Sequence, residues 1–135
     1  GMSAVWRGGD MHASFERASR LKQYSANVVL APSRKDPWII TLDHFATPEE
    51  LAAIRSEAEK RPWSEASMGD GFRLDLRNSS HTWLSIPSEA QASSPIASII
   101  RKVEHVTGVG RSHFQDMQVV RYDVGQYYRR HHDTA

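Results

Sequence analysis

Residues 47–60 carry the clearest helical pattern in the chain. Thr47 supplies a hydroxyl N-cap, Pro48 stands at the first helical position, and Glu50 follows three residues after the cap. This arrangement is typical of a capping box, in which each side chain bonds a backbone N–H group that the first turn leaves unpaired. We therefore expect a helix that ends before Pro62. Its expected buried face consists of Leu51, Ile54 and Ala58.

A second strong helical pattern covers residues 95–107. Ser94 and Pro95 mark its start, and Gly108 stands where a left-handed residue closes many helices. Residues 3–24 show a weaker pattern of the same kind, which predicts a further helix. The apolar residues at helical spacing are Ile96, Ile99, Ile100, Val103 and Val106 in the strong pattern, and Met11, Phe15, Ala18 and Leu21 in the weak one.

Five short runs of β-branched, aromatic or apolar residues predict strands. The last two runs are joined by the turn residues 123–125. Helices that precede the main strands are typical of an α+β domain, and we expect the two main helices to pack on one face of a single sheet containing residues 38–42 and 117–122. We also expect Trp63 and Trp83 to be core anchors. The five runs are residues 28–30, 38–42, 72–76, 117–122 and 126–133.

Charge and apolar run length argue against two classes of partner, nucleic acids and membranes. The 135-residue chain has a formal net charge of +1, with basic and acidic residues interspersed, so it lacks the clustered basic face of a nucleic-acid-binding protein. No apolar run approaches the roughly 20 residues that span a bilayer, and no signal peptide is visible, so we expect a soluble protein of undetermined compartment. The absence of cysteine excludes disulfides, thiolate metal sites and cysteine nucleophiles.

The triplet at residues 131–133, His-His-Asp, contains the best candidate metal ligands. Side chains alternate along a strand, so His131 and Asp133 are expected to point the same way and His132 the opposite way. An imidazole and a carboxylate on one face are two vertices of the 2-His-1-carboxylate triad, which is diagnostic of non-haem Fe(II) oxygenases. Taken alone, so short a triplet is more often a chance match in a solvated, polar chain end.

The residues around this triplet resemble one enzyme family. The segment 118–133, QVVRYDVGQYYRRHHD, is similar to the part of prolyl 4-hydroxylases in which a strand ending in tyrosine, a glycine turn and a second tyrosine precede the iron-binding His and Asp. Upstream, residues 45–51 and 99–108 resemble the family's two long helices, and residues 77–79 with Trp83-Leu84 resemble its Arg-any-Ser strand. The resemblance covers residues 27–135 and leaves residues 1–26 as a partly helical N-terminal extension.

The resemblance implies a fold and a reaction. The fold would be an incomplete double-stranded β-helix, the jelly-roll type of barrel, with the two main helices on one face. The reaction would be Fe(II)- and 2-oxoglutarate-dependent hydroxylation of peptidyl proline by O₂, with ascorbate as a further cofactor and a proline-containing peptide or protein as substrate. Two other interpretations stay open: a non-catalytic binding or scaffold domain derived from the same fold, and a related hydroxylase with another substrate.

The resemblance also assigns individual residues. His131 and Asp133 would be iron ligands, and Tyr122 and Tyr128 would bind 2-oxoglutarate. Two of these assignments compete with alternatives. Tyr122 also fits a buried strand tyrosine, and strict alternation along the strand puts Tyr127, not Tyr128, on the ligand face.

The printed sequence has two residues after Asp133. In the family, the second iron histidine and the basic residue that binds the far carboxylate of 2-oxoglutarate lie downstream of the His-any-Asp pair. We therefore expect residues 27–135 to be the N-terminal part of the catalytic domain, truncated after the first two metal ligands and inactive alone. A chain of only these residues would expose an open strand edge and is expected to self-associate.

Overall fold

The computed structural model describes residues 7–33, 37–65, 78–88 and 91–132. The described elements make an α+β fold, as the sequence predicts, and the chain divides into two compact units. The first unit comprises residues 1–53 and 86–115, and the second comprises residues 54–85 and 116–135. The α-helices are α1 (Asp10–Ala18), α2 (Pro48–Glu59) and α3 (Pro95–Thr107), the strands are β1 (Ala26–Leu30), β2 (Ile39–Leu42), β3 (Ser64–Glu65), β4 (Ser80–Leu84) and β5 (Met117–Arg121), and two 3₁₀ turns cover Lys22–Tyr24 and Arg111–His113.

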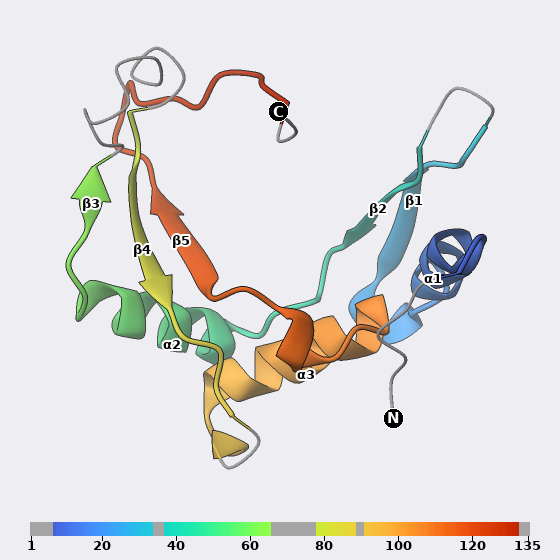
Figure 1. Cartoon of the computed structure of the whole chain (residues 1–135), viewed down its shortest axis with the longest axis horizontal. Helices are drawn as coiled ribbons and strands as arrows, with labels where there is room; N and C mark the ends of the chain where they lie inside the picture. Colours follow the sequence, from blue (N-terminus) through green and yellow to red (C-terminus); the bar gives the residue numbers. More distant parts are fainter. Residues whose placement is uncertain (1–6, 34–36, 66–77, 89–90, 133–135) are drawn as a thin grey trace. The chain divides into compact units, whose positions relative to one another are not determined.

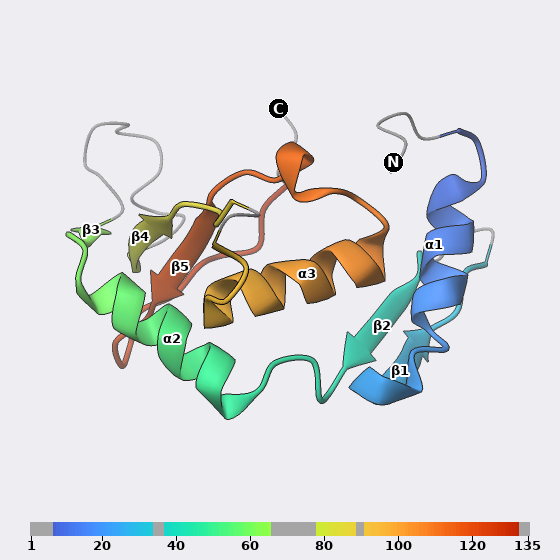
Figure 2. The same cartoon turned by 90° about the horizontal axis from the view of Figure 1, so that it is seen from below.

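In the first unit, β1 and β2 form an antiparallel two-stranded ribbon, and α1 lies alongside it (Figure 1 and Figure 2). Val28 pairs with Ile40, and a register shift follows between Val28 and Leu30. The weak helical pattern near the N-terminus is confirmed, because α1 forms and buries Ala18.

Helix α3 forms as predicted, with both of its end signals in place. The Ser94 hydroxyl accepts a hydrogen bond from the Ile96 backbone N–H at 3.2 Å, and Pro95 occupies the first turn. At the other end Gly108 has φ = +73°, a left-handed conformation that costs an L side chain energy but not glycine. The buried residues of the helix are Ile96, Ala97, Ile99 and Ile100.

Helix α2 also forms, and its capping box is confirmed. The Glu50 backbone N–H donates to Thr47 Oγ1 at 3.2 Å, and the Thr47 backbone N–H donates to Glu50 Oε2 at 2.9 Å. The predicted buried face is wrong at Leu51, which is 55% exposed, whereas Glu50 is 4% exposed. The reason is that the Glu50 carboxylate bonds to Ser98 and Lys102 of α3, so the inward-facing row of α2 starts one residue earlier than its apolar pattern suggests.

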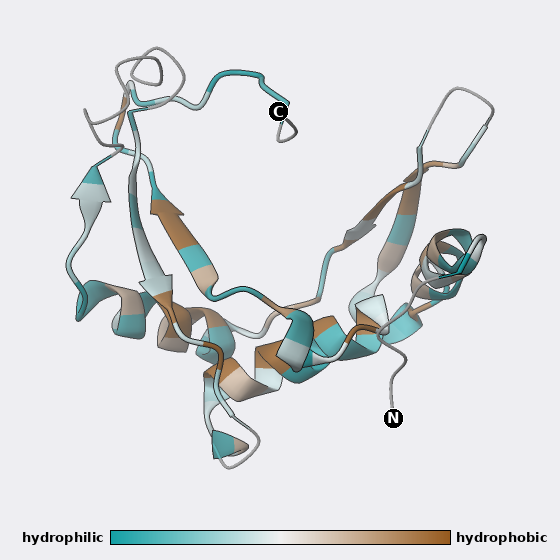
Figure 3. Ribbon diagram, viewed as in Figure 1, coloured by the Kyte–Doolittle hydropathy of each residue, from teal (hydrophilic) through white to brown (hydrophobic). Residues whose placement is uncertain are grey.

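In the second unit, β3, β4 and β5 form an antiparallel sheet in that order. One face of β4 is buried through Ser80, Thr82 and Leu84. The opposite face exposes Trp83 at 45% and, on β5, Val120 at 37%, so Trp83 is not the core anchor that the sequence predicts. Trp63 is half-buried, with the Arg121 guanidinium carbon 4.5 Å from its ring centroid. Figure 3 shows the apolar character of β5 and of β1. On β1, Val28 and Val29 are exposed.

Two predictions about the sheets are wrong. Residues 38–42 and 117–122 do not share a sheet, because β2 pairs with β1 and β5 pairs with β4. Residues 126–132 are not a strand and contain only an isolated bridge at Tyr128. Alternation within one segment predicts faces but not pairing partners, which depend on distant backbone groups. Asp133 and the strand predicted at residues 72–76 lie outside the described residues.

The described part of the chain gives no support for a bilayer-spanning segment, since each of its helices is too short or too polar to cross a membrane. The jelly-roll barrel stays a prediction, because the described strands pair as one two-stranded ribbon and one three-stranded sheet.

Candidate metal centre

The candidate ligand segment is reached through a tight turn after β5. The Gln126 backbone N–H donates to the Asp123 carbonyl at 2.9 Å, and the Gln126 side-chain oxygen accepts from the Asp123 N–H at 2.9 Å. Gly125 has φ = +88°, which favours glycine at this position. The turn predicted at residues 123–125 is therefore confirmed.

Asn78 fixes the chain immediately after this turn. Its side-chain oxygen accepts from the Tyr127 N–H at 2.8 Å, and its backbone N–H donates to the Tyr127 carbonyl at 3.2 Å. One side chain thus takes a hydrogen bond that a neighbouring strand would otherwise supply. These two bonds hold Tyr127 beside Asn78, two residues before β4.

The His131 imidazole is oriented by two contacts within its own segment. Nδ1 lies 2.8 Å from the Arg129 carbonyl oxygen. A carbonyl oxygen can only accept, so Nδ1 carries a proton and donates it to this carbonyl. The Tyr128 ring stacks on the imidazole, with centroids 4.1 Å apart and planes inclined by 17°. A backbone carbonyl on one imidazole nitrogen is the arrangement that orients metal-binding histidines through the other nitrogen.

The three tyrosines of this region differ in their surroundings. Tyr122 follows β5 and is 47% exposed, so it is not the buried strand tyrosine of the alternative interpretation. Tyr127 is 38% exposed and lies 5.2 Å from the Arg129 guanidinium carbon. Tyr128 is the tyrosine that contacts His131.

Two buried polar atoms follow closely after Asn78 in the chain. Ser79 Oγ and His81 Nδ1 are buried and have no hydrogen-bond partner among the described residues. Ser79 and His81 are two residues apart at the start of β4, so alternation places them on the sheet face that exposes Val120. The resemblance of residues 77–79 to an Arg-any-Ser strand was the one sequence signal that pointed to this place.

The structure brings together only part of the predicted site. Tyr128 and His131 are in contact, and Tyr122, which follows β5, is exposed. Asp133 lies outside the described residues, and within them no group of three or more His, Cys, Asp or Glu side chains could hold a metal ion. The imidazole of His131, oriented by its Nδ1 contact and by the Tyr128 ring, is of the donor type that Fe(II) takes in non-haem sites.

Comparison with known proteins finds two curated relatives, both from Arabidopsis thaliana. Prolyl 4-hydroxylase 1 is 31% identical over 102 residues, an alignment that covers 72% of this chain. Probable prolyl 4-hydroxylase 9 is 30% identical over 104 residues and covers 73% of this chain. The chain spans about 35% of the length of each relative. No family model and no solved structure matches the sequence.

Proposed function

Because this chain belongs to the prolyl 4-hydroxylase-type family, we propose that it contributes to an Fe(II)- and 2-oxoglutarate-dependent dioxygenase that hydroxylates peptidyl proline. In this proposal residues 27–135 form the N-terminal part of a jelly-roll catalytic domain, and residues 1–26 are an extension. The observation that carries the proposal is the orientation of the His131 imidazole by the Arg129 carbonyl and the Tyr128 ring.

His131 and Asp133 are the proposed metal ligands. A histidine and an aspartate from one segment supply two vertices of the facial triad, and a second histidine completes it. When bound, Fe(II) would supply the activation of O₂, driven by 2-oxoglutarate, that hydroxylates a C–H bond, and ascorbate would keep the iron reduced. The contribution of this segment is to present His131 in the tautomer that binds metal through Nε2.

Tyr122 and Tyr128 are the proposed 2-oxoglutarate contacts. Each phenol can donate a hydrogen bond to a carboxylate, which is a stronger acceptor than a neutral group. Tyr122 is 47% exposed and Tyr128 is 42% exposed, so a small molecule can reach both residues.

The exposed face of β4 and β5 is the proposed peptide contact. Trp83 is 45% exposed on this face and His81 lies edge-on to it, with ring centroids 6.5 Å apart. Aromatic surfaces of this kind bind proline rings, since extended proline-rich segments dock on aromatic-lined grooves. Ser79 Oγ and His81 Nδ1, which have no partner within the described residues, would supply hydrogen bonds to the peptide backbone after a small opening of this face.

The test combines metal binding with turnover in the whole protein. His131→Ala and Asp133→Ala are each expected to weaken Mn(II) or Fe(II) binding by about 100-fold and to abolish 2-oxoglutarate turnover, because each removes a ligand. His132→Ala is the matched control and is expected to be far milder. Turnover is followed as the mass gain of one oxygen atom on a proline-rich peptide.

Each outcome of this experiment separates the alternatives. Metal binding without hydroxylation of proline peptides would support a related hydroxylase with another substrate. Unchanged metal affinity in both ligand variants, or no metal binding by the unaltered protein, would overturn the proposal and support a non-catalytic binding domain.

A further inference from the structure

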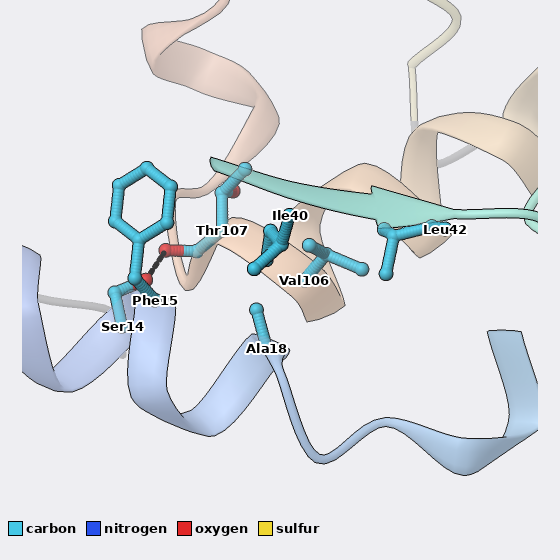
Figure 4. A pocket seen from close by; sticks show the side chains of 7 residues that line it. All are labelled: Ser14, Phe15, Ala18, Ile40, Leu42, Val106 and Thr107. Atoms are coloured by element: carbon cyan, nitrogen blue, oxygen red, sulfur yellow. Dashed lines mark hydrogen bonds between the residues drawn. The ribbon is translucent and has the colours of Figure 1, made fainter. Parts of the chain in front are cut away.

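A cavity of about 240 Å³ lies in the first unit, among α1, β2 and the C-terminal end of α3. Figure 4 shows Ala18 of α1 pointing toward Ile40 of β2 and Val106 of α3, with Phe15 and Leu42 on either side. These five side chains are hydrocarbon only. None of them takes part in the candidate metal centre, which belongs to the second unit.

The two hydroxyl groups beside the cavity are already engaged within the protein. Ser14 Oγ donates to the Thr107 carbonyl at 3.0 Å, drawn as a dashed line in Figure 4. Thr107 Oγ1 donates to the Val103 carbonyl at 2.8 Å and accepts from the Val109 backbone N–H at 3.1 Å. A polar ligand would lose its water hydrogen bonds here without replacement, so the described lining selects against it.

The Arg17 guanidinium beside this site already donates hydrogen bonds to α3. Its Nη1 donates to the His105 carbonyl at 3.0 Å and its Nη2 to the Val106 carbonyl at 3.1 Å. The cation at this helix end is therefore occupied in closing α3. A peptide backbone would need hydrogen-bond partners here. The polar side chains of Ser14, Arg17 and Thr107 already bond to backbone carbonyls of α3, whereas a free apolar molecule needs no such partner.

We propose that this cavity is a binding site for a small, neutral, apolar molecule with one or two fused rings. An enclosed apolar cavity of about 150 Å³ is known to bind benzene. The cavity here is partly open to solvent and measures about 240 Å³, so it accommodates a bicyclic ring. The bound molecule would contact three elements at once and would hold α1 against β2 and α3. The site is independent of the proposed dioxygenase function.

The experiment is an NMR titration of the protein with indole as the probe. Indole is expected to bind with a Kd on the order of 0.1–1 mM, as suits a ligand of its size. The backbone amide shifts should be largest at Ala18, Ile40 and Val106. Indole-3-carboxylate, which adds a charge to the same ring, is expected to bind at least tenfold more weakly.

Two cavity-filling variants test the location from opposite walls. Ala18→Leu on α1 and Val106→Met on α3 should each weaken indole binding at least tenfold. Ala13→Leu is the matched control, because Ala13 is exposed on the same helix and does not line the cavity. Circular dichroism establishes which variants keep their helices, and the binding loss is judged on those.

Three results would overturn the proposal. They are the absence of indole binding to the unaltered protein, amide shifts centred outside the cavity, and unchanged affinity in a folded cavity-filling variant. The shift map decides the matter even where neither filled variant folds, since it needs only the unaltered protein.

Discussion

The stacked pair of Tyr128 and His131 shows how a single residue can have two separable roles. The ring of Tyr128 lies 4.1 Å from the imidazole, centroid to centroid, and restrains its orientation. The hydroxyl group of the same side chain is a proposed contact to 2-oxoglutarate. Contacts of the first kind affect metal affinity, whereas contacts of the second kind affect the cosubstrate.

Replacing Tyr128 in two ways separates these roles. Tyr128→Leu removes the ring and is expected to weaken metal binding of the whole protein roughly 10- to 100-fold. Tyr128→Phe keeps the ring and should leave metal affinity unchanged while raising the KM for 2-oxoglutarate. Calorimetric metal titration and 2-oxoglutarate kinetics measure the two effects. Equal metal affinity in the Leu and unaltered proteins would show that the stack does not position His131.

Between elements, Glu50 joins α2 to α3 as well as capping α2. Burial raises the pKa of this carboxyl group, but hydrogen bonds from Lys102 and Ser98, and from the Thr47 backbone, outweigh burial and lower its pKa to about 2. Its Oε2 lies 2.7 Å from Lys102 Nζ, which also donates to the Phe45 carbonyl. The ionised carboxylate is therefore stabilised by folding.

The pKa of Glu50 predicts how stability depends on pH. Its folded-state pKa lies below the ordinary value of 4.5, so the stabilisation is complete above pH 4.5 and is lost as the pH falls toward 2. Glu50→Gln should lower the free energy of unfolding by about 2 kcal/mol at pH 7, after allowance for solvent screening.

Urea denaturation at neutral and acid pH measures this loss. The difference between Glu50→Gln and the unaltered protein should shrink as the pH approaches 2.5. The exposed neighbour Glu49 provides the control Glu49→Gln, which should have little effect at either pH. A deficit that persists at low pH would mean that shape, not charge, stabilises the contact.

Across the whole molecule, α1 is held to α3 by residues far apart in sequence. Arg17 and Ser14 bond to backbone carbonyls 88 to 93 residues away. Arg17 Nη2 also lies 3.1 Å from where a Cβ would stand on Gly108, so the guanidinium packs closely on the end of α3. Residues predicted as an extension are therefore part of the first compact unit in their described portion.

Arg17→Gln should loosen α1 while leaving α3 helical. Two charged hydrogen bonds on an exposed helix end are worth about 1 kcal/mol, which corresponds to roughly fivefold faster hydrogen exchange in α1. Arg20→Gln, two residues after the end of α1, is the control, because Arg20 pairs with Glu16 four residues earlier in the chain. Equal exchange in both variants would show that Arg17 contributes nothing to the docking of α1.

The sequence by itself determined the features that depend on residues within about one helical turn. The capping box at Thr47, the Ser94 cap, the left-handed Gly108 and the Gly125 turn were all predicted. Each depends on a side chain and a backbone group close together in the chain, so local pattern suffices. The His-any-Asp motif and its neighbours likewise indicated the family before any fold was known.

Only the tertiary structure decided which distant residues meet. The contact between Asn78 and Tyr127 spans 49 positions, and the contact between Glu50 and Lys102, which accompanies the exposure of Leu51, spans 52. Both contacts involve a polar side chain whose distant partner the apolar pattern does not reveal. Periodicity shows which faces of an element are apolar. A hydrogen bond between groups far apart in sequence depends on which segments become neighbours, and the packing of the elements alone decides that.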